Sequence, residues 1–261
     1  MVIVAPLLGA AGGLGAYTAY GWGWAALLAV TGLVAGAGYG FGWFAALLMV
    51  PFAATFISPV STVGDAVTYA VILAISTLYG VIGARKMGVP ATVEGRRISA
   101  PEACAVAVLF GAILGGAAAI GVSLGWTEPY WVPEPVLVLV LYVMIGKRDR
   151  IRGKAIGTAA GAAAALPVAL IDPPAAVLTL VGIVALLLAF TQTKVYWLMY
   201  GLYTFAVVLL LAAPGQVAFE AEERGLQILL GVGLLAIGLF VLEAMRKWLG
   251  ERASGLPQTP A

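Results

Sequence analysis

The apolar residues of this chain form long runs, separated by short turns that are polar or rich in glycine and proline. A helix that crosses a membrane needs about 20 apolar residues, and ten runs approach or reach this length. They cover residues 2–19, 22–39, 42–58, 66–85, 102–125, 130–147, 154–172, 174–190, 193–213 and 225–247. Helix breakers such as Asp172-Pro173-Pro174 separate neighbouring runs, because proline lacks an N–H donor and restricts the residue before it. The pattern predicts an all-α, polytopic integral membrane protein with about ten transmembrane helices.

The basic residues predict the orientation of this path. Cytoplasmic loops of membrane proteins carry an excess of Lys and Arg. If the ten segments alternate across the bilayer, Arg224 alone lies outside, among acidic residues. The other basic residues share the opposite side: Arg85, Lys86, Arg96, Arg97, Lys147, Arg148, Arg150, Arg152, Lys154, Lys194, Arg246, Lys247 and Arg252. Both termini are therefore expected in the cytoplasm, with the chain as a multi-pass protein of a prokaryotic inner membrane.

The composition supports this class. The 261 residues are 62% hydrophobic and 10% charged, whereas a soluble domain carries roughly 25% charged residues. Ten spans leave no room for a soluble catalytic domain. The first run lacks a basic segment before it, so we expect the first helix to be retained and not cleaved as a signal peptide. The basic residues flank helices, which favours contact with membrane lipid over nucleic-acid binding.

The sequence lacks the residues that several kinds of chemistry require. The chain has no histidine and a single cysteine, Cys104, so imidazole metal sites and disulfides within the chain are excluded. No predicted span has two carboxylates, and no glycine-rich loop ends in Gly-Lys-Ser/Thr. We therefore expect neither an enzyme nor a cofactor or metal site.

Many of the 34 glycines lie inside the predicted spans at steps of four residues. Such spacing makes a groove that lets helix backbones approach closely. The clearest sets are Gly32, Gly36 and Gly40, then Gly111 and Gly115, and then Gly157 and Gly161. These faces serve either packing within the chain or a homo-oligomer interface, and the spacing does not choose between the two.

A faint repeat suggests the domain organisation. Residues 69–88 and 227–250 are both apolar helices with an Arg-Lys pair near their predicted cytoplasmic end. We predict an N-terminal membrane half of four helices over residues 1–88, a cytoplasmic loop over 89–101, a six-helix domain over 102–250, and a tail over 251–261.

Two landmarks in the second half carry a family resemblance. The first is Tyr130-Trp131, an apolar span, the basic run 147–154, and then Gly157-Thr158 and Gly161. The second is the run Glu223-Arg224-Gly225-Leu226-Gln227. Over residues 102–250 the chain resembles the membrane domain of the fusaric acid resistance and aromatic acid exporter family. It departs from the family where Lys154 replaces an expected Arg and Gln227-Ile228 replaces an expected Asp-Thr. The resemblance implies a membrane transporter that exports organic, often aromatic, acids.

The basic run is the first candidate site for such a small organic anion. Arg152 and Lys154 lie closest to the helix mouth, where Gly157 leaves space and Thr158 offers a hydroxyl. A cationic side chain there would attract a carboxylate. The alternative is that the cluster only anchors the loop and contacts anionic lipid headgroups.

Glu134 is the candidate for proton coupling. If its span starts near residue 130, eighteen residues cover about 27 Å and Glu134 lies one turn inside the bilayer, where an ionisable group is costly and functional by default. The flanking Pro133 and Pro135 favour the other interpretation, an outer-loop residue.

The ninth span adds a candidate aromatic face. Tyr196, Tyr200 and Tyr203 are spaced four and three apart and therefore share one face of a helix. They would either stack on an aromatic substrate or pack against neighbouring helices. Gln227 is a lone amide that bonds a neighbouring helix or lines a path. The hypothesis is a proton-coupled exporter of small amphipathic or aromatic organic acids, and the alternative is a scaffold subunit that binds a partner.

Overall fold

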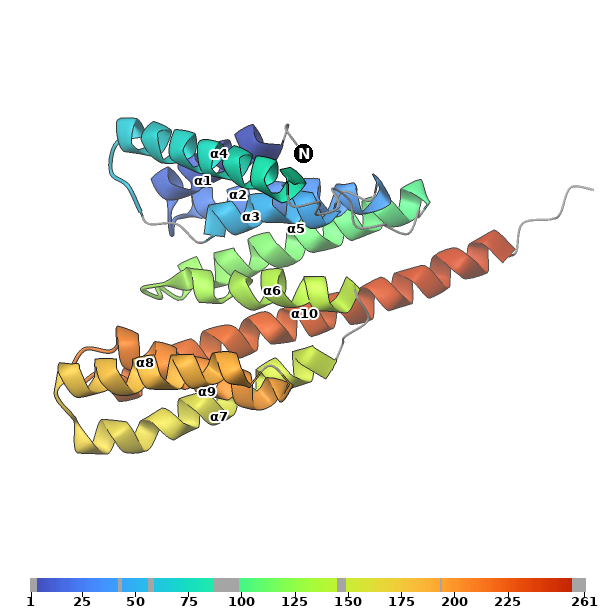
Figure 1. Ribbon diagram of the computed structural model, residues 1–261. Coiled ribbons are helices and arrows are strands. Elements are labelled where there is room, and N and C mark those ends of the chain that lie inside the picture. Colours follow the sequence, from blue (N-terminus) through green and yellow to red (C-terminus); the bar gives the residue numbers. More distant parts are fainter. Residues whose placement is uncertain are drawn as a thin grey trace, which may run out of the picture. The chain divides into compact units, whose positions relative to one another are not determined.

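The computed structural model describes residues 4–41, 44–55, 59–86, 99–144, 149–192 and 194–254. Within these ranges the regular elements are all helical, with ten α-helices and two short 3-10 helices (Figure 1). The elements are α1 (Val4–Thr18), α2 (Trp22–Ala37), η1 (Gly38–Phe41), α3 (Phe44–Thr55), α4 (Val63–Lys86), α5 (Ala100–Ser123), η2 (Pro129–Trp131), α6 (Pro133–Met144), α7 (Asp149–Ile171), α8 (Ala175–Thr191), α9 (Tyr196–Leu211) and α10 (Val217–Ser254). The predicted all-helical fold class is confirmed for the described residues.

Each of the ten predicted spans corresponds to one helix, but two of the helices begin five or more residues earlier than expected. The α7 helix starts at Asp149 instead of 154, and α10 starts at Val217 instead of 225. Both helices have an acidic residue in the first turn, Asp149 and Glu220, which interacts favourably with the positive end of the helix dipole. The prediction that these polar residues lie in loops is wrong, because both helices continue past the point where the hydropathy of the chain falls.

Three of the described helices are long and apolar enough to cross a membrane by themselves: Ala100–Ser123, Asp149–Ile171 and the Val217–Met245 part of α10. The apolar helices α2, α8 and α9 have 16 or 17 residues, about 24–26 Å at 1.5 Å per residue. The hydrocarbon core is about 30 Å thick. Ten crossings and cytoplasmic termini therefore remain predictions.

The chain divides into two compact units. Unit 1 contains the described residues of 1–125 together with α10 from Leu235 onward, and unit 2 contains Trp126–Leu234. This boundary differs from the predicted domains, because α5 packs against α2 of the N-terminal half. The predicted domain boundaries stay predictions.

Unit 1 is held together by helices whose backbones come close at glycines. A Cβ at Gly32 would lie 3.0 Å from the Cα of Gly111, and a Cβ at Gly36 would lie 2.6 Å from the Cα of Ala107. The glycine stripes of α2 and α5 therefore face each other. The Trp24 indole, fully buried, donates a 2.8 Å hydrogen bond to the Ala54 carbonyl of α3. These predicted glycine faces serve packing within the chain.

In unit 2 the glycines of α7 lie against α9. A Cβ at Gly157 would collide with the carbonyl of Trp197, and one at Gly161 with the carbonyl of Gly201. The contacts advance together along both helices, so α7 and α9 run parallel. A buried apolar cluster packs against the same helices and includes Ala165, Leu178, Val208, Leu209, Val217 and Ala221.

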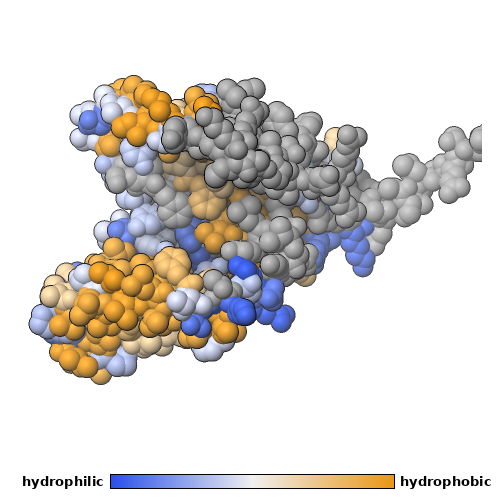
Figure 2. Space-filling view, in the orientation of Figure 1, coloured by the Kyte–Doolittle hydropathy of each residue, from blue (hydrophilic) through white to orange (hydrophobic). Residues whose placement is uncertain are grey.

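The outward faces of unit 2 are apolar. Leu170 is 89% exposed, Ile171 76% and Phe190 66%, and Figure 2 shows orange, apolar residues over the unit that contains α7 and α8. Large apolar side chains exposed over a whole face are typical of contact with lipid. The helix length, composition and exposed apolar faces together describe a membrane protein.

Two turns that the charge pattern places on the same side of the membrane meet in the structure. The Asp172 side chain, in the turn between α7 and α8, accepts a 2.7 Å hydrogen bond from the backbone N–H of Gly215. Gly215 lies in the turn between α9 and α10. This contact agrees with the predicted alternation of the spans.

The glycine contact between α7 and α9 can be tested with a matched pair of substitutions. We expect Gly157→Ala to lower the unfolding temperature in detergent clearly, because its added methyl group meets rigid backbone of α9. Gly233→Ala in α10 is the control, since a Cβ there meets nothing within 4 Å, and alanine is intrinsically favoured over glycine in a helix by about 1 kcal/mol. Equal melting temperatures for the two variants would contradict the close approach.

Candidate functional site

The α7 and α9 helices bear a ladder of three polar side-chain pairs. Each pair joins residues 46 positions apart, and successive pairs are four residues, or about one helical turn, apart. The rungs are Arg150 with Tyr196, Lys154 with Tyr200, and Thr158 with Thr204. Because the helices are parallel and their backbones touch at glycines, residues at equal steps face each other.

The first rung is the most exposed of the three. The Arg150 guanidinium lies over the Tyr196 ring, with its Cζ 3.5 Å from the ring centroid, and it donates a hydrogen bond to the Tyr196 hydroxyl. Both side chains are partly exposed. In Figure 2, hydrophilic residues gather toward the end of unit 2 where α7 begins. The predicted orientation puts this rung at the cytoplasmic mouth.

The second rung carries a buried ion pair. Lys154 and Glu134 are only 3% and 7% exposed. The Lys154 Nζ donates to both Glu134 carboxylate oxygens, at 2.8 Å to Oε1 and 2.5 Å to Oε2. The same ammonium lies 5.3 Å from the centroid of the Tyr200 ring. The ring face supports the cation electrostatically, so the ammonium lies between a carboxylate and an aromatic ring.

Glu134 reaches this position because α6 begins at Pro133. Proline is tolerated in the first turn of a helix, where its missing N–H has no partner to lose, so Pro133 and Pro135 do not delay the helix. Glu134 lies in the first turn of α6 and is buried. The outer-loop interpretation that these prolines favoured is therefore wrong. Its charge also acts on the partly buried Tyr203 phenol of α9.

The third rung is neutral. Thr158 is fully buried and Thr204 is 2% exposed, and the Thr204 hydroxyl donates a 3.4 Å hydrogen bond to the Thr158 hydroxyl. From Arg150 to Thr158 the ladder covers about 12 Å along the helix axis. Polarity therefore decreases from cation to hydroxyl as burial increases.

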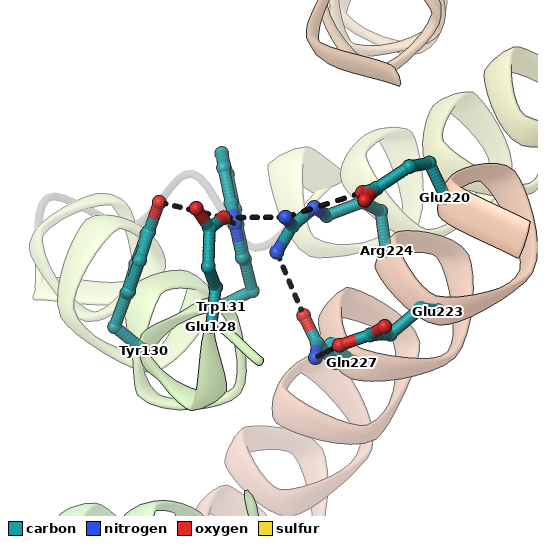
Figure 3. A network of polar contacts seen from close by, with 7 residues as sticks. All are labelled: Glu128, Tyr130, Trp131, Glu220, Glu223, Arg224 and Gln227. Atoms are coloured by element: carbon teal, nitrogen blue, oxygen red, sulfur yellow. Dashed lines mark hydrogen bonds and ion pairs between the residues drawn. The ribbon is translucent and has the colours of Figure 1, made fainter. Parts of the chain in front are cut away.

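A second polar network joins the segment around η2 to the start of α10 (Figure 3). Arg224, 2% exposed, is its centre. One guanidinium nitrogen pairs with the carboxylates of Glu128 and Glu220, the latter at 3.2 Å, and the guanidinium lies 5.2 Å from the Trp131 ring. Trp131 and Tyr130 each donate a 3.1 Å hydrogen bond to Glu128.

The network continues along α10. Gln227 is fully buried, accepts a 3.4 Å hydrogen bond from Arg224 and donates one of 2.8 Å to Glu223. These residues share one face because they are spaced three or four apart in a helix. The predicted span began at residue 225 and left Arg224 and the glutamates before it outside the helix, which is wrong because α10 begins at Val217.

The structure brings most of the predicted site residues together. Lys154, Thr158, Tyr196 and Tyr200 belong to the ladder, and Glu134 and Tyr203 adjoin its second rung. Arg152 is apart from them, with an exposed side chain. Gln227 belongs to the Arg224 network and bonds residues of its own helix. Their roles in binding remain untested.

Arg150 belongs to the ladder, although the sequence pattern did not predict it as a site residue. It precedes Lys154 by four residues and shares its helix face, whereas Arg152 precedes Lys154 by two and points elsewhere. This signal was present in the spacing, but it applies only if the run 149–154 is helical. Arg224 was missed as a buried residue for a similar reason.

The described ranges contain no group of three Cys, Asp or Glu side chains placed to hold a metal ion. The charged and aromatic side chains of the two clusters, the ladder and the Arg224 network, can bind charged groups and aromatic rings. Both clusters lie within residues 115–240, the segment that matches a known protein family.

Residues 115–240 match a family model described as fusaric acid resistance protein-like. This segment is similar to the fusaric acid resistance protein-like family. The match confirms the resemblance seen in the sequence and covers a little under half of the 261-residue chain. No curated protein and no solved structure matches the chain. The family match indicates a membrane transporter-type function for residues 115–240, a segment that includes the ladder and the Arg224 network.

The buried ion pair can be tested by removing its charges singly and together. Replacing Lys154 by Met leaves the Glu134 carboxylate unpaired in a buried site, and breaking such a pair costs about 3–5 kcal/mol. We therefore expect Lys154→Met to lower the unfolding temperature in detergent strongly. The double variant Glu134→Gln/Lys154→Met should recover most of this loss, because no unpaired charge remains. A double variant as unstable as the single one would contradict a direct pair.

The Arg224 network allows a second test of stability. We expect Arg224→Gln to destabilise the protein by about 3 kcal/mol, since two partly buried carboxylates lose their cation. Arg152→Gln makes the same chemical change at an exposed position and should change stability by no more than about 0.5 kcal/mol. Thermal unfolding in the same detergent compares the two variants, and similar shifts would argue against the network.

Proposed function

We propose that the protein exports small amphipathic organic anions, above all aromatic carboxylic acids, across a prokaryotic inner membrane. The observation that carries this proposal is the buried Lys154 ammonium, which lies between the Glu134 carboxylate and the Tyr200 ring. A carboxylate joined to an aromatic ring would match these two neighbours. The family match of residues 115–240 supports a transporter-type role.

In this proposal the ladder is the substrate path. The exposed Arg152 attracts the anion at the mouth, where a peripheral charge acts mainly on the rate of association. Arg150 and Tyr196 then offer a cation and a ring together, and Lys154 with Tyr200 offers the same combination one turn deeper. Tyr203 adds a phenol near Glu134, and Thr158 offers a hydroxyl beyond it.

Glu134 is the proposed proton-coupling residue. An ionisable carboxylate inside a membrane protein is costly and marks a functional position by default. Glu134 is buried and bonded to Lys154, the most deeply buried cation of the proposed path. A change in its protonation would therefore be felt directly at the substrate site.

The scaffold alternative has less support. It required glycine faces that remain available to a partner, yet Gly32, Gly36, Gly111, Gly157 and Gly161 contact other helices of the same chain. A homo-oligomer through other faces remains a prediction. A polar ladder inside a transmembrane unit is an expensive feature for a protein that only binds partners.

The proposal is tested by flux in proteoliposomes. Wild-type protein should move radiolabelled para-hydroxybenzoate faster than protein-free vesicles, which measure leakage of the acid. We expect Lys154→Met to reduce the protein-dependent flux at least about tenfold, equivalent to about 1.4 kcal/mol of lost binding. Stability in detergent is checked in parallel, so that a folding defect is recognised.

The same assay distinguishes the proposed roles of Arg150 and Arg152. Arg150→Gln should raise the apparent KM several-fold, because it removes a cation that lies on an aromatic ring of the path. Arg152→Gln should change KM little, and the change should shrink at high salt. Wild-type flux equal to leakage, or equal effects at the two positions, would contradict the proposed path.

A further inference from the structure

We infer that Glu134 and the carboxylate of the substrate are alternative partners of Lys154, so that one proton is taken up with each anion and the loaded site is electrically neutral. This inference rests on the proposed function and adds how the movement of protons is coupled to that of the anion. It predicts cotransport of proton and anion in the same direction.

The two partners compete for the N–H donors of one ammonium. Lys154 donates to both oxygens of Glu134, and its remaining surroundings include the Tyr200 ring. An ammonium has three N–H donors, of which Glu134 uses two. While Glu134 keeps its two hydrogen bonds, this ammonium has at most one N–H left for a substrate carboxylate. It can give the substrate two hydrogen bonds only when Glu134 releases at least one of its own.

Charge balance then sets what must accompany the anion. The empty site holds one cation and one anion, both buried. Adding a substrate anion alone would leave a net negative charge in a medium of low dielectric constant, and adding a proton alone would leave a net positive charge. Either state is penalised by the loss of solvation. Proton and anion together keep the total at zero.

Few other groups can compensate the charge of the pair. From α7 the facing group is Lys154 itself, and from α9 the facing groups are Tyr200 and Tyr203. Phenols are uncharged near neutral pH. From α10, Gly231 packs against Val132 and Pro135 at the start of α6. Among these described contacts, Lys154 and Glu134 are the charged members.

The exchange is balanced at each step. A proton from water binds one carboxylate oxygen of Glu134, and the hydrogen bonds from the Lys154 ammonium to that carboxylate break. The substrate carboxylate accepts these hydrogen bonds in its place. On the other side of the membrane the substrate leaves, Glu134 returns its proton to water, and the original ion pair forms again. No oxidation or reduction takes place.

Two consequences distinguish this rule from other forms of coupling. The transport rate should not depend on membrane potential, because the loaded and empty sites carry the same net charge. The direction should follow the combined gradient of proton and anion, so that export proceeds when the acid accumulates inside. Antiport of a proton against the anion would instead move charge.

The experiment uses wild-type protein in vesicles that contain a pH-sensitive dye, with the potential clamped by potassium and valinomycin. A gradient of para-hydroxybenzoate should move protons in the direction of the anion, beyond the leakage seen in protein-free vesicles. The protein-dependent ratio should be about one proton per anion. The rate should be the same at zero and at inside-negative potential.

Glu134→Gln provides the second arm, because glutamine imitates the protonated carboxyl group but cannot exchange a proton. This variant should still carry the anion, should lose protein-dependent proton movement, and should become sensitive to potential, since its empty site keeps the Lys154 charge. Glu222→Gln is the control, because it makes the same chemical change at an exposed position of α10, keeps both members of the ion pair and should retain coupling.

The outcomes separate the inference from the proposed function. Proton movement opposite to the anion, or a wild-type rate that follows the potential, would overturn the inference while transport itself stands. Wild-type vesicles without anion flux above leakage would contradict the proposed function. If Glu134→Gln proves unstable, the dye and potential measurements on wild-type protein decide the question.

Discussion

The close parallel approach of α7 and α9 supports the whole candidate site. Apolar side chains give helices no drive to associate in lipid, so contact depends on packing and on small residues that let backbones meet. Gly157 and Gly161 supply that contact on α7, and the carbonyls of Trp197 and Gly201 are what they meet on α9. Once two parallel helices touch in this way, side chains at equal steps of four must face each other. The ladder is a direct result.

The two buried cations in the described part of unit 2 each pair with carboxylates and with an aromatic ring. Lys154 has Glu134 and Tyr200, and Arg224 has two carboxylates and Trp131. The two clusters differ in what they permit. Arg224 is tied to several groups at once, which suits a fixed joint between the η2 segment and α10. Among the described residues Lys154 pairs with one carboxylate, that of Glu134, so one protonation event would release this partner.

Much of the site could be predicted from spacing alone. Helical periodicity placed Tyr196 and Tyr200 on one face, and the position of Lys154 before a glycine and a threonine marked it as the cation nearest the path. Two errors came from ending helices where the hydropathy falls. This rule put Arg150 in a loop and Arg224 in an outer turn, although both positions are helical and packed. The helix dipole favours an acidic residue in the first turn. Asp149 and Glu220 could therefore have indicated the earlier starts of α7 and α10.

The helical membrane class, the approximate location of each helix and the family landmarks could be read from the chain, because hydropathy, helix breakers and short motifs are local properties of consecutive residues. The partners of the charges could not be read in this way. Glu134 and Lys154 were assigned to opposite ends of the membrane path, yet they form one buried pair. That pairing depends on where α6 starts and how α7 packs, and long side chains can bridge the remaining distance. Only the tertiary structure contains this information, because it arises from contacts between helices that are distant in sequence.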